Sequence, residues 1–189
     1  MMKQRGLGAA NVRLYFVITR LLFLIALTGV GMLANAQKIP VPDVPEKIKA
    51  PAGEELVLVA RASGSQIYTC QQGSDGKPAW TLKAPEAELR DDQGKVIGSH
   101  FAGPTWKHID GSEVAGKAAA KVDAPDADSI PWLLLAATGH SGNGVLSKVT
   151  SIQRIHTKGG QPPAGGCDPS GNAEKKISYT ADYYFYGPK

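Results

Sequence analysis

The sequence predicts an all-β domain, an antiparallel β-sandwich or barrel of about eight to ten short strands, with little helix after residue 36. All 13 prolines and 18 of the 22 glycines follow residue 36, so long helices have little room. The runs between these breaks are rich in β-branched and aromatic residues, which favour strands. Dipeptides typical of hairpin turns separate several of the runs: Asp75-Gly76, Gln93-Gly94, Asp110-Gly111 and Asn143-Gly144.

We expect strands in ten runs, over residues 55–61, 66–71, 79–83, 87–90, 96–102, 105–109, 113–122, 130–137, 145–155 and 177–186. Residues 145–155 alternate between two faces, with Ile152 and Arg154 on the same one, and the run ISYTADYYFY at 177–186 is rich in aromatic side chains. Residues 132–137 (WLLLAA) fit a buried helical turn equally well.

Residues 1–36 have the layout of a secretory signal peptide. A basic start is followed by an apolar run over residues 21–33 and by the small-x-small sequence Ala34-Asn35-Ala36, so we expect cleavage after Ala36. A transmembrane anchor is the alternative, but Arg20 interrupts the apolar stretch and leaves it short of the roughly 20 residues that a spanning helix needs. The exported chain, periplasmic or extracellular, would start at Gln37 and keep no stable membrane anchor.

The basic charge of the chain belongs to this segment. The whole sequence has 21 Lys and Arg against 17 Asp and Glu, but the four charged residues before Gln37 are all basic, so the remainder is neutral. A nucleic-acid partner is therefore not expected, because such a surface needs a clustered excess of Lys and Arg.

The remainder divides into an arm and one domain. Residues 37–53 contain four prolines and are expected to form an extended arm that packs on the domain through Val41 and Val44. Residues 54–189 have the length of a single β-rich domain.

The only two cysteines are Cys70 and Cys167. In an oxidising compartment such a pair usually forms a disulfide, which here would hold the Gly- and Pro-rich segment 158–174 against the sheet. Two free thiols or a catalytic pair are the alternatives, although the spacing is not Cys-x-x-Cys.

One catalytic pattern is nearly present. Gly139-His140-Ser141-Gly142-Asn143 comes close to the Gly-x-Ser-x-Gly elbow of serine hydrolases, but Asn143 replaces the last glycine. The elbow also needs a helix after its serine, where this sequence predicts a strand. A Gly-rich hairpin loop is the simpler interpretation.

Metal-ligating residues are sparse. The histidines are His100, His108, His140 and His156, and none are spaced as His-x-His or His-x-x-x-His. His108 and Asp110 would share a strand face, but a metal site needs further ligands. There is also no Gly-x-Gly-x-x-Gly after a strand for a dinucleotide, so we expect neither a metal nor a cofactor.

The segment HFAGPTWKHIDG, residues 100–111, is the densest cluster of aromatic, imidazole and acidic side chains. Aromatic rings beside polar groups are typical of grooves that bind sugars and other small ligands. We therefore expect the ligand-binding residues to be His100, Trp106, His108 and Asp110, and the partner to be a glycan or another small ligand. Burial of these aromatics in the core is the alternative.

Several short sequence motifs follow one another in a characteristic order: YTC at 68–70, WTLKAPEAEL at 80–89, HFAGPTW at 100–106, DGS at 110–112, WLLL at 132–135, IQR at 152–154 and YTADY at 179–183. In this combination the chain resembles the uncharacterised "domain of unknown function 3455" family, over essentially all of its length from about residue 54. The resemblance implies no established activity and no known catalytic residues.

Two classes of function follow from these observations. One is a binding or structural module of the cell envelope or the extracellular space. The other is a hydrolase or metal-dependent enzyme that uses the region of His100, His108 and Asp110. The lack of a complete catalytic pattern favours the first class, whereas convergence of the histidines and Asp110 in one open pocket would favour the second.

Overall fold

The computed structural model describes residues 40–171 and 173–189, so the predicted signal peptide at 1–36 lies outside the described residues. The eight strands are β1 (Glu54–Gln72), β2 (Pro78–Arg90), β3 (Val96–Phe101), β4 (Thr105–His108), β5 (Glu113–Val122), β6 (Trp132–Ser141), β7 (Ser151–Gly159) and β8 (Glu174–Pro188). Two 3-10 turns, η1 (Glu46–Ile48) and η2 (Pro169–Gly171), complete the described elements. Across residues 40–171 and 173–189, no helix has the length and apolar character needed to cross a membrane.

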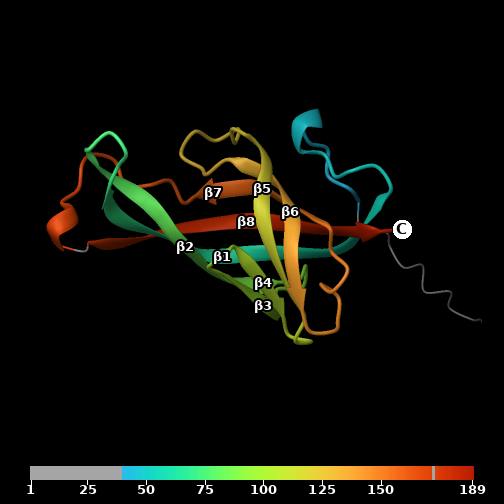
Figure 1. Ribbon diagram of the computed structural model, residues 1–189. Coiled ribbons are helices and arrows are strands. Elements are labelled where there is room, and N and C mark those ends of the chain that lie inside the picture. The colour runs from blue at the N-terminus through green and yellow to red at the C-terminus, as the bar shows by residue number, and fades with distance from the viewer. Residues whose placement is uncertain (1–39, 172) are drawn as a thin grey trace, which may run out of the picture. The chain divides into compact units, whose positions relative to one another are not determined.

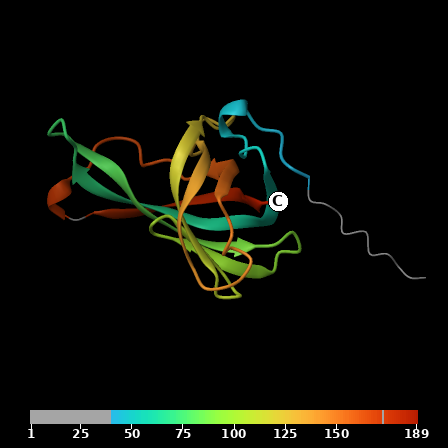
Figure 2. The ribbon, with the colours of Figure 1, turned by 45° about the vertical axis from the view of Figure 1, so that its right-hand side comes forward.

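The strands form one closed antiparallel ring in which each pairs with its neighbours in the sequence (Figures 1 and 2). β8 closes the ring by pairing with β1 from Glu54↔Pro188 to Thr69↔Glu174. The predicted all-β antiparallel class is thus confirmed, and the closure makes it a barrel rather than a sandwich. β1, β2 and β8 are the longest strands, and their shared end projects to the left in Figure 1.

The ten expected strand runs become eight because two predicted breaks lie inside strands. β1 continues through Gly64 and β2 continues through Pro85. A Cβ at Gly64 would lie 2.1 Å from the Glu86 carbonyl oxygen, so the glycine allows the two strands to approach each other rather than ending one of them. Residues with a low strand propensity are tolerated here because long-range pairing on both sides of β1 holds them.

The prediction of a strand from residue 145 is wrong. Residues 142–150 form a loop, and β7 begins only at Ser151. The buried side chains of Leu146 and Val149 are three residues apart, as in a turn. Their segment does not join the sheet because the Val145 and Leu146 N–H groups donate to the side chains of Asp110 and Ser112 instead.

Alternate residues of β8 show how the interior is filled. Tyr179, Ala181, Tyr183 and Phe185 all belong to the main buried cluster, as expected for one face of a strand. The Trp106 ring lies edge-on to Tyr183, with 5.3 Å between ring centroids, and edge-on to Phe185 at 6.0 Å. These rings form the centre of the core, because each aromatic side chain buries about 150–250 Å².

The Pro-rich arm covers part of the outer face of the sheet. Val44 and Ile48 are buried beside Ile155, while Val41 is 64% exposed and does not pack. The Gln153 side chain donates from Nε2 to the Ile48 carbonyl oxygen at 2.7 Å. The arm therefore contributes apolar side chains and a buried hydrogen bond to the barrel.

The predicted disulfide between Cys70 and Cys167 is present, with the two Cα atoms 5.8 Å apart. It joins the end of β1 to the segment that leads into η2 and β8. The two cysteines are 97 residues apart, for which the chain-entropy description gives at most about 4.7 kcal/mol of stabilisation. Such a bond is consistent with an oxidising compartment.

Candidate functional site

A pocket of about 300 Å³ opens into the ring of strands. Every strand supplies at least one lining residue, so the pocket lies inside the barrel rather than on one outer face. One part of its wall is apolar, formed by Leu82, Pro85, Pro104, Leu133 and Leu135. The other part is polar, formed by Gln66, His100, Trp106, Arg154 and Tyr183.

Two of the four predicted ligand-binding residues, His100 and Trp106, line this pocket. They face each other across the hairpin of β3 and β4, and their rings stack with centroids 4.4 Å apart and planes 10° from parallel. Both side chains are also buried, at 3% and 1% exposed. They therefore line the pocket and pack in the core at the same time.

The surroundings of His100 set its protonation. The Nδ1 atom lies 2.9 Å from the Thr105 carbonyl oxygen, which can only accept, so Nδ1 carries the proton and donates it. Burial lowers the pKa of His100 to about 3, opposed in part by this hydrogen bond. The ring is therefore neutral near pH 7, with its Nε2 lone pair free of a proton.

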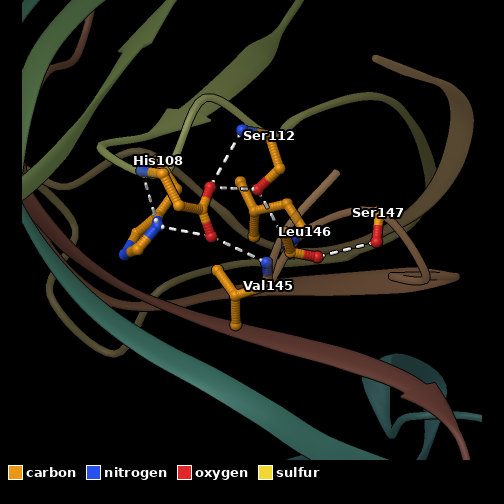
Figure 3. A network of polar contacts seen from close by, with 7 residues as sticks. His108, Ser112, Val145, Leu146 and Ser147 are labelled. Carbon is orange, nitrogen blue, oxygen red and sulfur yellow. Dashed lines mark hydrogen bonds and ion pairs between the residues drawn. The ribbon is translucent and has the colours of Figure 1, made fainter. Parts of the chain in front are cut away.

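The other two predicted residues, His108 and Asp110, do not line the pocket. They lie at the turn after β4, where His108 Nδ1 is 3.0 Å from Asp110 Oδ2 (Figure 3). The structure therefore brings two of the four residues to this pocket and places the other two outside its lining. His108, the last residue of β4, and Asp110, in the turn that follows, do lie together.

Asp110 holds the loop at 142–150 to this turn. Its Oδ1 accepts from the Ser112 N–H at 2.9 Å and from Ser112 Oγ at 2.6 Å, and its Oδ2 accepts from the Val145 N–H at 2.8 Å (Figure 3). Ser112 and Val145 thereby hold the pKa of Asp110 well below its usual range. A Cβ at Gly144 would lie 2.3 Å from this carboxylate, so glycine is needed there.

The remaining histidines lie elsewhere in the fold. His140 Nε2 is 2.7 Å from the Val149 carbonyl oxygen, and His156 Nδ1 is 2.9 Å from Asp182 Oδ2. Across residues 40–171 and 173–189, no group of three His, Cys, Asp or Glu side chains is arranged to hold a metal ion. Ser141 ends β6 and is followed by a loop and then β7, so the elbow of a serine hydrolase is not formed.

Two lining residues, Arg154 and Gln66, were not among the predicted site residues. Arg154 lies on β7 between Leu133 of β6 and Tyr183 of β8. The alternation of residues 145–155 already placed Arg154 on the same face as the apolar Ile152. A charged residue on an inward face is a sequence signal for a functional residue. Gln66 on β1 is 1% exposed, and no local pattern marks it.

The polar wall of the pocket contains hydrogen-bonding groups without partners. Within the described part of the chain, Gln66 Nε2, Trp106 Nε1, Arg154 Nε and the Tyr183 hydroxyl are buried and unpaired. These four atoms have almost no exposed surface, so protein atoms enclose them and they do not face the open space of the pocket. The Tyr183 hydroxyl lies near Tyr179 and Arg154.

The fold and this site define a class: a small, disulfide-linked, closed antiparallel barrel with a polar-walled interior pocket. The family model "Protein of unknown function (DUF3455)" matches residues 51–187, and the chain belongs to this family. Searches of curated proteins and of solved structures find no match.

We predict that His100 makes the protein sensitive to acid. Between pH 6.5 and about 3 the unfolded state binds a proton that the buried ring does not, so stability falls as the pH falls through this window. The expected contribution is a slope of about 1.4 kcal/mol per pH unit in the free energy of unfolding. Urea titrations between pH 6 and 4 should show a shallower slope for His100→Gln, and equal slopes would contradict the assignment.

We predict that Asp110 stabilises the fold through the turn that it caps. Asp110→Asn leaves one acceptor oxygen where the carboxylate supplies two, so the melting temperature at pH 7 should fall. The pKa of Asp110 is lower in the folded state than its ordinary value of 3.8. The extra stability of the wild type over Asp110→Asn is therefore fully present above pH 3.8 and is lost as the pH falls through the folded pKa. Asp92→Asn, at an exposed turn position, is the matched control. A melting temperature unchanged in Asp110→Asn would rule out this role.

Proposed function

We propose that this protein is an exported binding module that takes a small ligand into the interior pocket. The observation that carries the proposal is a pocket of about 300 Å³ to which all eight strands contribute, lined by apolar side chains, by His100 and by Arg154. That volume is at the lower end of ordinary ligand pockets, and the combination of apolar wall and few polar groups is typical of them.

The contacts of His108 and Asp110 support binding over catalysis. An enzyme that used the region of His100, His108 and Asp110 would bring these groups to one open pocket. Only His100 lines it, and its imidazole is stacked on Trp106 and hydrogen-bonded to Thr105. Asp110 uses both carboxylate oxygens to hold backbone and side-chain groups of the turn and loop.

Blocking the pocket tests the proposal. A thermal-shift screen of small aromatic compounds, small acids and simple sugars should yield compounds that stabilise the protein, by about 2.7 kcal/mol at 100 times the dissociation constant. Ala118→Trp places a large side chain in the pocket lining and should abolish the shift. Ala119→Trp, one residue along β5 and outside the lining, is the matched control and should retain it. Shifts that survive Ala118→Trp, or no shift with any compound, would defeat the proposal.

The export part of the proposal rests on the signal-like layout of residues 1–36 and on the disulfide. N-terminal sequencing of protein recovered from the exported fractions of producing cells should give Gln37 as the first residue. A chain that keeps Met1 and stays in the cytoplasm or the membrane would contradict it.

A further inference from the structure

We propose that the ligand of this pocket is an organic anion, a carboxylate on a small apolar body, and that Arg154 recognises the carboxylate. This inference rests on the proposed binding function and names the chemical class of the ligand.

The pocket has positive charge and no described negative charge to balance it. Its charged lining residues are Lys83 and Arg154, and no Asp or Glu lines it. Lys83 is already paired, because its Nζ lies 2.5 Å from Glu174 Oε2. Arg154 makes no ion pair with any described carboxylate, and its Nη2 donates a hydrogen bond to the Pro131 carbonyl oxygen at 2.8 Å. A partly buried guanidinium, which stays charged at all ordinary pH values, is thus left without a counter-ion.

The guanidinium of Arg154 matches an acceptor. It carries several N–H donors and no acceptor, and one donor, on Nη2, is used by the Pro131 carbonyl oxygen. A carboxylate accepts several hydrogen bonds on its two oxygens, and such bonds are about twice as strong as those between neutral groups. A cationic ligand would instead meet the charge of Arg154 and leave the donors unpaired.

His100 adds no competing charge. Its Nδ1 proton is donated to the Thr105 carbonyl oxygen and its ring is neutral near pH 7. Recognition of the anion therefore falls to the guanidinium, whose planar set of donors suits a carboxylate better than a point charge does.

The rest of the wall determines what carries the carboxylate. Leu82, Pro85, Leu133 and Leu135 contribute apolar side chains to it. Because the pocket holds about 300 Å³, the apolar body is small, such as one or two rings or a short chain.

Matched pairs of acids and amides test the charge directly. The probes are hexanoate, benzoate and 2-naphthoate, each compared with its neutral amide by calorimetry on protein produced from the full-length coding sequence. At least one acid should bind the wild type about tenfold or more tightly than its amide, the effect of one charge-assisted hydrogen bond.

Two variants and a control assign this preference to the pocket. Arg154→Met keeps much of the length of the side chain and removes its charge, so the preference for the acid should fall to within about threefold. Arg61→Met removes one positive charge outside the pocket lining and should leave the preference unchanged. If Arg154→Met fails to fold, Arg154→Lys keeps the positive charge, removes the planar set of donors and should weaken binding of the acid more than of the amide.

The outcomes separate this inference from the proposed function. Equal binding of acids and amides, or an acid preference that persists in Arg154→Met, overturns the carboxylate assignment and leaves a binding pocket. An absence of binding by every acid and amide, together with an empty thermal-shift screen, overturns both.

Discussion

The pairing of the first strand with the last is the interaction on which the rest of the structure depends. β1 and β8 are paired along most of their length, from Glu54↔Pro188 to Thr69↔Glu174. A sheet edge presents unpaired N–H and C=O groups that can recruit other chains, and only closure removes it entirely. The same pairing brings the Cys70 end of β1 beside the start of β8, where the disulfide to Cys167 fastens the preceding segment.

Closure also creates the interior in which packing and binding compete for space. An eight-stranded barrel is just wide enough to be filled by side chains or to hold one small ligand. This barrel does both along the same strands. Ile152 and Phe185 belong to the packed core, while Arg154, two residues along β7, lines the pocket, and Tyr183, two residues before Phe185 on β8, belongs to both. A guanidinium inside such a barrel stabilises the fold poorly, which is consistent with a role in binding.

The local sequence pattern predicted strand boundaries correctly where turns bound the strand. It failed where long-range contacts determine whether a strand continues. Residues 113–122 form the predicted strand with both ends correct, whereas Gly64 and Pro85 suggested breaks that the pairing of β1 with β2 and β8 overrides. The loop at 142–150 could not be predicted because it depends on Asp110, more than thirty residues earlier. In the site, His100 and Trp106 were identified from composition, and the alternation around Ile152 could have indicated Arg154. Gln66 had no local signal, since only the closed ring gives it pocket neighbours.

The closed ring has a kinetic consequence as well as a structural one. The contacts that close the ring join β1 to β8, more than a hundred residues later in the sequence, and such non-local pairings form slowly because a long loop must be ordered first. During synthesis the seam cannot form until the last strand has been made, since the partner of β1 is the final element. The topology thus keeps the barrel open until β8 has been synthesised, and a protein proposed to be exported remains unclosed, and so able to cross a membrane, during this interval.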